Sequence, residues 1–431
     1  MRRVVLPLAL VAIVAASVPA GAQSITNCSI ASQNRYVHDV MRDLYYWNAS
    51  LPNVNSSSFR SPEALLEALR YRPLDSRFSY IGSRASEEAF YSDSQFIGFG
   101  YASAFDGLGL RILQVFPDSP ASEAGLQRGD RIVAIGGQSV VALIAANALD
   151  AALGPSQEGV AMSFRFERID GSIVDARIVK RPVTIPTVSH VQIIDVGGRR
   201  TGYLFFRNFV QPSRAALDEA FAALREAGAT ELVLDLRYNG GGLVSVAQHL
   251  ASLIGGARTE GQVFAEYFHN ERNAFRNEIT RFEAADPALR LDRLVVITTR
   301  SSASASELVI NALRPFIPVV TVGEASYGKP VGQYGINFCD KVLYPVAFTL
   351  RNADGQGDYF DGIAADCAAA DDPDRQLGDP QEASLAEALH VVGTGQCSAP
   401  LPPAAVVERR RAARAADVLP RYGLAQLIGA H

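Results

Sequence analysis

The 431-residue sequence predicts mixed α/β and β domains: a small helical module, then a β-rich domain, then a larger α/β domain. Three observations support this prediction. Apolar residues recur at helical spacing near the N-terminus, strand-like runs alternate with turn residues from about 96 to 185, and β-branched runs alternate with helical stripes after about 190. A chain of this length is sufficient for two or three domains with separate cores.

The first 22 residues have the organisation of a secretory signal peptide. Arg2 and Arg3 precede an apolar stretch over residues 4–18, and small residues at 20–22 form a cleavage site. The stretch is short for a membrane span, and no later segment approaches the ~20 apolar residues that a span needs. We therefore expect an exported protein, periplasmic or extracellular, without a transmembrane segment.

The charge balance disfavours two classes of partner. Without Arg2 and Arg3, the 40 Lys and Arg residues become 38 against 45 Asp and Glu, a net charge of −7. An acidic chain has no electrostatic attraction for nucleic acid or for an anionic membrane surface. We therefore predict no nucleic-acid partner.

The cysteines predict disulfides. Cys28, Cys339, Cys367 and Cys397 form an even set in the exported part of the chain, which indicates two bridges. Three pairings are possible, and free buried thiols are the alternative. We favour Cys339 with Cys367, because they flank what reads as one antiparallel unit, and hence Cys28 with Cys397, which would tie the two ends together.

The helical module is predicted over residues 23–90. Residues 31–47 form one amphipathic helix, and Ser61 with Pro62 begins a second helix, as a capping serine followed by a first-turn proline. The buried face of the first helix is predicted to collect Val37, Val40, Met41 and Leu44.

The β-rich domain is predicted over residues 91–185. Residues 96–102 and 108–116 flank Asp106-Gly107, which is typical of a hairpin. A short helix from Pro120 to Ala124 follows, and then a strand over 131–135.

This region resembles a PDZ domain. The residues that carry the resemblance are Ser119-Pro120-Ala121, Ala124-Gly125-Leu126, Gly129-Asp130, Ile132, Ile135 and Gly137. The resemblance implies a loop whose N–H groups bind a peptide's terminal carboxylate, and a helix that closes the peptide groove. The helix would be Val141 to Leu153, and the loop would be Gly98, Phe99, Gly100 and Tyr101. A PDZ core that only holds domains together is the alternative.

The α/β domain is predicted over residues 186–398. Its buried parallel strands are residues 232–236, 294–299 and 319–322, and its helices are marked by apolar stripes at 217–224, 243–254 and 308–313. Loops at the carboxyl ends of parallel strands meet at one sheet edge. We therefore expect three segments to converge there: Asn239 to Gly242, Ser302 to Ser306, and Gly328-Lys329.

Serine, lysine and glycine amides at one edge are suited to acyl transfer. A serine hydroxyl needs a base to become nucleophilic, and a lysine whose pKa is lowered by burial can be that base. Backbone N–H groups at a glycine turn and a helix N-terminus can stabilise an oxyanion. The alternative is structural: Ser304 and Glu307 fit a capping box. Ser302 could instead cap the helix while Ser304 faces the crevice.

Two segments resemble the S41 peptidases, the C-terminal processing or tail-specific proteases. They are the run Asp235 to Gly242 and the run Ser302 to Glu307, followed by Gly323-Glu324 and Tyr327-Gly328-Lys329. The resemblance implies a ClpP/crotonase-like protease core. It further implies Ser304 as nucleophile, Lys329 as general base, Gln333 as the residue that orients the base, and the amides of Ala305 and Gly241, or Gly240, as the oxyanion hole.

The sequence thus predicts an exported serine endopeptidase that needs no metal or cofactor. Its expected substrates are proteins or peptides with unfolded or apolar C-terminal tails, and an oligomer is possible. The competing hypotheses are a non-catalytic binding protein on the same fold, and a serine/histidine variant that uses His249. The tail, residues 399–431, carries Arg409, Arg410, Arg411 and Arg414 and is expected to present a solvated helix face.

Overall fold

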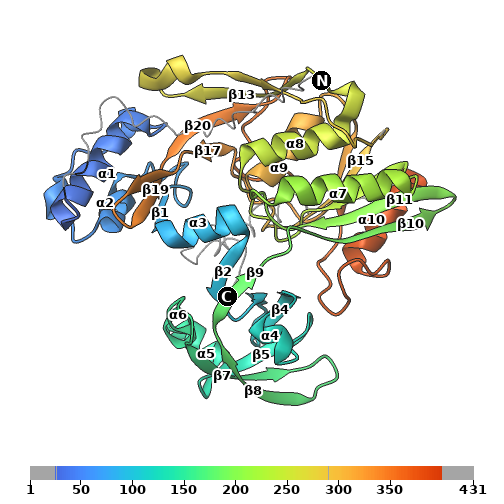
Figure 1. Ribbon diagram of the computed structural model, residues 1–431, viewed down its shortest axis with the longest axis horizontal. Coiled ribbons are helices and arrows are strands. Elements are labelled where there is room, and N and C mark those ends of the chain that lie inside the picture. The colour runs from blue at the N-terminus through green and yellow to red at the C-terminus, as the bar shows by residue number, and fades with distance from the viewer. Residues whose placement is uncertain (1–24, 26, 290, 400–431) are drawn as a thin grey trace, which may run out of the picture.

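The computed structural model describes residues 25, 27–289 and 291–399. The predicted signal peptide and the arginine-rich tail segment lie outside the described residues. Figure 1 shows three parts: the helical module at one end of the molecule, the α/β core beside it, and the β-rich domain below, joined to the rest by the paired strands β2 (Gln95–Gly98) and β9 (Arg181–Thr184). Within the described part of the chain, no helix is long and apolar enough to cross a membrane.

The two predicted N-terminal helices are confirmed. Helix α1 (Ile30–Leu44) begins after Ser29, and α2 (Pro62–Leu69) begins after Ser61, and each serine side chain accepts a hydrogen bond from a first-turn N–H. The face predicted to be buried is buried: Val37, Val40, Met41 and Leu44 pack with Leu65, Leu66 and Leu69 of α2. Two 3-10 turns, Asn48–Ser50 and Ser56–Ser58, lie between the helices.

A small sheet joins the helical module to the core. Strand β1 (Tyr80–Ser83) pairs with β19 (Lys341–Tyr344), which pairs in turn with β18 (Ile336–Phe338). Helix α3 (Arg84–Asp93) follows β1 and leads to β2. The module is therefore built onto a hairpin that comes from much later in the chain.

The favoured disulfide pairing is wrong. Two bridges form as predicted in number, but they join Cys28 to Cys339 and Cys367 to Cys397. The reason is that Cys339 follows β18 in the small sheet, beside the N-terminal module, whereas Cys367 begins β21 (Cys367–Ala368) of the large sheet. These two cysteines do not flank one antiparallel unit, so they cannot pair.

Removing the Cys28–Cys339 bridge is expected to destabilise the protein. The bridge spans a sequence separation of 311 residues, and loss of such a bridge typically costs about 2–5 kcal/mol. A Cys28→Ser/Cys339→Ser variant should therefore unfold at a lower temperature, measured by circular dichroism. The matched control is Cys367→Ser/Cys397→Ser, whose separation of 30 predicts a smaller loss. An unchanged Tm in the first variant would contradict the expectation.

The β-rich domain is a sheet in the order β3-β4-β5-β7-β8, with β6 beside β5. The strand over 131–135 and the helix that begins at Pro120 are confirmed. The predicted hairpin is partly wrong, because Gly100 has φ +98 and divides its first strand: Gln95–Gly98 pairs with β9, and the next strand pairs with β4. The bounds are β3 Tyr101–Phe105, β4 Leu110–Val115, α4 Pro120–Glu123, β5 Arg131–Ile135, β6 Gln138–Ser139, β7 Ala161–Glu167 and β8 Ile173–Val179.

The predicted groove helix is also not continuous. Residues 141–153 form two short helices, α5 (Val140–Ala145) and α6 (Leu149–Leu153), instead of one. Asn147 between them has φ +52, a conformation that ends a right-handed helix.

The core of the α/β domain is a six-stranded sheet in the order β10-β11-β12-β15-β16-β21. The three predicted parallel strands, β12, β15 and β16, are neighbours in it. Side chains alternate between two core clusters: Leu232 and Leu234 of β12 face one, and Val233 faces the other. The bounds are β10 Val188–Val196, β11 Arg199–Phe206, β12 Glu231–Asp235, β15 Leu294–Thr298 and β16 Val319–Gly323.

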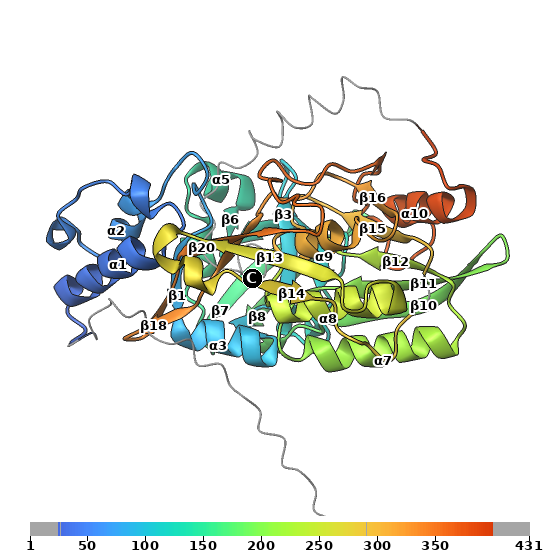
Figure 2. The same ribbon diagram turned by 90° about the horizontal axis from the view of Figure 1, so that it is seen from above.

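Helices cover both faces of this sheet. Figure 2 shows α7 and α8 on one side and α10 on the other. The three helices predicted from apolar stripes are confirmed as α7 (Ser213–Glu226), α8 (Val244–Gly255) and α9 (Ala305–Leu313). Helix α10 (Ala383–Thr394) packs its apolar residues against the opposite face. A second sheet has the order β14-β13-β20-β17. The bounds are β14 Ile279–Arg281, β13 Val263–His269, β20 Val346–Arg351 and β17 Val331–Gln333. The 3-10 turns Gly256–Arg258 and Glu271–Arg276 flank β13.

Candidate active site

The three segments predicted to converge do lie together at one edge of the large sheet. A single cavity of about 480 Å³ is lined by residues from each of them. Its walls also include α3 of the N-terminal region and strands of both smaller sheets. Four residues of the three segments line it, namely Gly242, Ser304, Ala305 and Lys329. Residues that follow these segments line it as well: Leu243, Val244, Leu308, Pro330, Val331, Gly332 and Gln333.

The glycine turn packs directly against the serine turn. Gly241 has φ +96, and a Cβ placed on it would lie 2.8 Å from the Ser304 Cβ and 2.9 Å from the Ala305 nitrogen. Only glycine permits this approach. The Asn239 carbonyl accepts hydrogen bonds from the Ala303 N–H (3.0 Å) and from the Ser306 hydroxyl (2.9 Å), which fixes the two turns to each other.

The amides of the glycine turn differ in availability. The Gly241 N–H donates to Asn239 Oδ1 at 2.9 Å, and Gly241 is buried outside the cavity lining. Gly242, by contrast, is half-buried and lines the cavity together with Ala305. Ala305 is the first residue of α9, where backbone N–H groups have no partner within the helix. In this conformation Gly242, rather than the predicted Gly241, presents its backbone to the cavity.

Only one of the three central serines faces the cavity. The Ser302 hydroxyl donates to the Leu236 carbonyl (2.8 Å) and the Ser306 hydroxyl to the Asn239 carbonyl, so both are held by backbone and both side chains are buried. Ser304 is half-buried and lines the cavity. Its backbone has φ +56 and ψ −112, a conformation that costs a non-glycine residue about 1–3 kcal/mol.

Helix α9 is capped at Ser304, so the alternative in which Ser302 caps the helix is wrong. The Ser304 carbonyl accepts the Leu308 N–H (2.8 Å), and the Ser304 N–H donates to Glu307 Oε2 (2.8 Å), so the predicted capping box of Ser304 and Glu307 is confirmed. The structural and chemical hypotheses for this serine are therefore compatible, because Ser304 caps the helix and also borders the cavity.

Glu307 joins the serine turn to the lysine loop. This carboxylate is fully buried, and it accepts the N–H groups of Ser304 and Lys329, both at 2.8 Å, on the same oxygen. Its other oxygen accepts the Gly328 N–H at 2.6 Å and the Ser326 hydroxyl. Burial raises the pKa of Glu307, and these four donors act in the opposite direction. The sequence indicated the first of these bonds but not the bridge to the lysine loop.

Lys329 is the buried amine of the cavity. It is 7% exposed, and its Nζ donates a hydrogen bond to Gln333 Oε1 at 2.6 Å. Burial removes water from the ammonium group and lowers the pKa of Lys329 to about 8, although the carboxylates of Asp75, Glu307 and Glu87 oppose the shift. At this pKa about a tenth of the amine is uncharged at pH 7 and about half near pH 8.

Gln333 is fixed in one orientation. Its Nε2 donates to the Phe78 carbonyl and to the Tyr344 carbonyl, each at 2.8 Å, so Oε1 is the atom that faces Lys329. Because Phe78 belongs to the helical module, the N-terminal region takes part in positioning the lysine.

Asp75 supports this arrangement from behind. The carboxylate is fully buried and accepts the N–H groups of Phe78 and Ser79, both at 2.9 Å, together with the hydroxyls of Ser79 and Tyr45. It therefore holds the turn that presents the Phe78 carbonyl. Nothing in the local sequence distinguishes Asp75 from an ordinary surface aspartate, and the sequence analysis missed it.

The predicted carboxylate-binding loop lies away from this cavity. The side chains of Phe99 and Tyr101 are buried in the core of the β-rich domain, with ring centroids 6.5 Å apart. Among the four loop residues, Phe99 borders a second cavity of about 640 Å³, which lies between α3, β2 and α6 and also includes Lys180. Gly98, Gly100 and Tyr101 do not line it.

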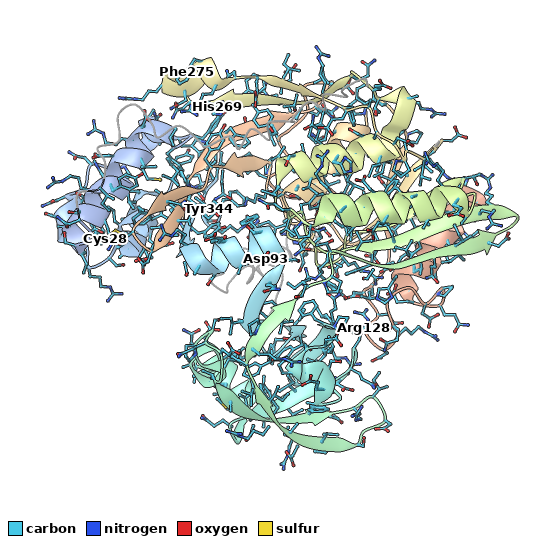
Figure 3. All side chains as sticks on the ribbon, viewed as in Figure 1. Cys28, Asp93, Arg128, His269, Phe275 and Tyr344 are labelled. Carbon is cyan, nitrogen blue, oxygen red and sulfur yellow. A yellow bond between two sulfur atoms is a disulfide. The ribbon has the colours of Figure 1, made fainter. Side chains whose placement is uncertain are left out.

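The β-rich domain contacts the loop that carries the glycine turn. Arg128 (labelled in Figure 3) is almost fully buried and donates from one nitrogen to the Tyr238 hydroxyl at 2.8 Å and from another to Asp371 at 3.0 Å. Tyr238 has φ +63 and lies three residues before Gly241, and Arg207 donates to its carbonyl. Sequence reasoning missed this contact, because nothing in the sequence pairs an arginine with a tyrosine so far along the chain.

His249 is not part of the cavity. Its Nε2 lies 2.7 Å from Asp218 Oδ1, between α8 and α7, and it is absent from the cavity lining. The histidine variant of the predicted chemistry therefore has no support from the geometry.

Three parts of the chain match known family models. Residues 200–368 match peptidase family S41, residues 32–80 match the peptidase S41 N-terminal domain, and residues 111–162 match a PDZ domain. The chain is 29% identical over 241 residues to the carboxyl-terminal-processing peptidase 1, chloroplastic, of Arabidopsis thaliana, which covers 55% of this chain and 48% of that protein. It spans about half the length of the curated relatives that it matches first.

Solved structures share the fold. A structure from Bacteroides fragilis NCTC 9343, assigned by its name to the S41 proteases, matches with a TM-score of 0.66 at 25% identity, over 83% of this chain and 96% of that one. The photosystem II D1 C-terminal processing protease matches with a TM-score of 0.52 at 19% identity, over 85% and 98% of the two chains, a likeness of fold alone. The predicted family resemblance and fold class are confirmed.

Proposed function

We propose, on the premise that this chain is a member of peptidase family S41 with an S41 N-terminal domain and a PDZ domain, that it is a serine endopeptidase. It cuts protein substrates through an acyl-enzyme formed on Ser304, with Lys329 as general base. The observation that carries this proposal is the Glu307 carboxylate, which binds the backbone N–H of both residues on one oxygen and so keeps the two loops in a fixed relation.

The proposed reaction begins with a proton transfer. The uncharged Lys329 amine takes the proton of the Ser304 hydroxyl while Oγ forms a bond to the carbonyl carbon of the substrate. The carbonyl oxygen becomes an oxyanion, the C–N bond then breaks, and the leaving amine takes the proton from the Lys329 ammonium. Water attacks the resulting ester with Lys329 again as base, and the proton returns to Ser304.

We assign the oxyanion to the backbone N–H groups of Ala305 and Gly242. Both residues line the cavity beside Ser304, whereas the Gly241 N–H is engaged by Asn239. One such donor typically contributes a factor of about 10²–10³ to kcat. The role of Gly241 is then to permit the close approach of the two turns, and Gly242 takes the place that the sequence assigned to Gly241.

Gln333 is proposed to orient the base. Replacing it by leucine removes the acceptor of Lys329 Nζ and leaves the Phe78 and Tyr344 carbonyls without their donor. We expect kcat/KM to fall about 10²-fold, because a base displaced by about 1 Å loses its alignment. Initial rates on a fluorogenic peptide measure this effect. In the comparison variant, Gln333→Glu, a new negative charge favours the Lys329 ammonium, so activity should recover as pH rises. If activity recovers with pH in both variants, or if neither variant loses activity, Gln333 does not orient the base.

We propose that the PDZ domain recognises substrate tails and gates the site. Support comes from the contact of Arg128 with Tyr238, on the loop that leads to the glycine turn. Unfolded or apolar C-terminal tails are the proposed ligands, because pairing to a PDZ strand reads the backbone and tolerates many side chains.

Removing the Arg128 contact should reduce activity. In Arg128→Ala the bonds to Tyr238 and Asp371 are lost, and we expect kcat to fall about 10-fold to 100-fold as the oxyanion turn loosens. The matched control is Arg131→Ala, which removes an arginine of the same domain whose ion-pair partners, Asp106 and Glu167, lie within that domain. Equal kinetics of the two variants would contradict the coupling.

Export to the periplasm or the extracellular space is proposed as well. Two disulfides support it, since such bridges form and persist mainly in oxidising compartments.

Digestion of casein tests the proposed function. The wild type should cleave casein, and Ser304→Ala and Lys329→Ala should not. Equal cleavage by all three proteins would contradict the proposed roles of Ser304 and Lys329. No cleavage by any of them would favour a binding protein on the same fold.

A further inference from the structure

One end of the Ser304 cavity combines a carboxylate with tyrosine rings. We call it the Glu87 end and define it by Glu87 and Tyr91 of α3, Tyr80 of β1 and Tyr344 of β19, all of which line the cavity. Tyr344 is labelled in Figure 3, where it lies between the small sheet and α3. The other end is lined mainly by apolar side chains such as Leu308, Phe348 and Leu350.

The tyrosines form a fixed aromatic wall. Tyr80 and Tyr344 are register partners in the β1–β19 pair, and their rings stack with centroids 4.7 Å apart. The Tyr91 ring lies 6.4 Å from the Tyr344 ring. Burial raises the pKa of each of the three hydroxyls, so they remain neutral. Neutral phenol rings attract cations at their faces.

The Glu87 carboxylate forms no ion pair with the described residues, although the charge of Lys329 acts on it from further away. It is half-buried, and it accepts a hydrogen bond from the Tyr80 hydroxyl at 3.3 Å. Gly82 leaves it room, since a Cβ there would lie 2.5 Å from Glu87 Oε1. Burial raises the pKa of Glu87 to about 7, and the tyrosine hydrogen bonds and the charge of Lys329 oppose the shift. A partly desolvated carboxyl of this kind gains more from a cation than an exposed one does.

Three other charged groups line the same cavity. Arg84 and Glu88 lie on α3 and are exposed, so water and salt screen their opposite charges. In the active form of the site Lys329 is uncharged, because a general base must have lost its proton, and this form predominates above its pKa of about 8. In that form the net charge at this end is acidic.

The geometry points to the Glu87 end as a subsite for a basic side chain, and we infer that the enzyme favours a lysine or arginine close to the scissile bond. This inference rests on the proposed function, because it names the class of substrate for the Ser304 site. The cation would bind Glu87 and lie over the tyrosine rings, while the apolar end of the cavity takes an uncharged neighbour. Glu87 is then the residue that determines this specificity.

Cleavage of matched peptides tests the inference. One series carries a single lysine placed at each position around the scissile bond in turn, and a second series carries norleucine, its apolar counterpart, at the same positions. At one position we expect the wild type to prefer lysine about 10-fold to 100-fold in kcat/KM, as for a hydrogen bond to a charged group. Glu87→Gln should bring this ratio close to one; because both peptides are compared in the same protein, any effect of Glu87 on the pKa of Lys329 cancels from the ratio. The control, Asp93→Asn, removes one charge at the end of the same helix, outside the cavity lining, and should keep the preference.

Binding separates this inference from the proposed function. The affinity of the same peptides for Ser304→Ala and for Ser304→Ala/Glu87→Gln, measured by fluorescence anisotropy, requires no catalysis. A lysine preference that is present in the first protein and lost in the second supports the subsite even if the wild type cleaves nothing. A lysine preference that is absent in the first protein, or that persists in the second, overturns it whether or not peptides are cleaved.

Discussion

Replacing Ser304 by alanine is expected to reduce kcat/KM by about four to six orders of magnitude, because no other described hydroxyl of the serine turn is in a position to take its place. Ser302 and Ser306 donate their hydroxyls to backbone carbonyls and are buried. Fluorogenic peptide cleavage and active-site titration measure the effect. The Tm should stay within a few degrees of that of the wild type, because alanine keeps the two backbone bonds of this position, to Glu307 and Leu308.

The matched control for this variant is Ser301→Ala. Ser301 belongs to the same turn, but its hydroxyl makes no hydrogen bond with the described residues and does not line the cavity. Its activity should remain within about threefold of that of the wild type. A Ser304→Ala protein that keeps more than a hundredth of the activity would exclude Ser304 as the nucleophile.

The second large effect concerns Lys329 and pH. A general base must be uncharged, so wild-type kcat/KM should rise about tenfold per pH unit below the pKa of about 8 and level off above it. In Lys329→Ala, kcat/KM should fall about 10³–10⁴-fold and should no longer rise with pH in this range. Initial rates between pH 5.5 and about pH 9.5, a range that brackets this pKa, give the profile. A flat wild-type profile would argue against a lysine base.

Stability distinguishes this loss from unfolding. Because the pKa of Lys329 is about 8 in the folded protein and higher when unfolded, the unfolded chain binds more protons below about pH 10, and stability rises with pH between these values. Burying this amine therefore destabilises the fold at pH 7. We expect the free energy of unfolding of Lys329→Met to equal that of the wild type or to exceed it by up to about 3 kcal/mol, with the same or a higher Tm. The variant should nevertheless be inactive.

The sequence predicted the elements that carry the chemistry because their signals are local. The strand before the glycine turn, the strand before the serine run and the three helices around them each follow from periodicity within a short window. Convergence of Ser304 and Lys329 followed from a topological rule on strand ends, without knowledge of distances.

Other features could not be predicted because they depend on contacts between distant segments. The pairing of Cys28 with Cys339 requires knowing that the N-terminal module is built onto a hairpin near residue 340. Asp75, Arg128 and Glu87 act through partners that only the folded chain brings near. The amide of Gly241 also looked available until the position of the Asn239 side chain was known.

The neck formed by β2 and β9 has a consequence for the history of this protein. The chain enters and leaves the PDZ domain through two antiparallel strands that lie side by side, so the ends of the domain are neighbours. A segment with adjacent ends can be inserted, exchanged or deleted by recombination without rerouting the rest of the polypeptide. Evolution can therefore exchange this domain while the α/β core is inherited intact.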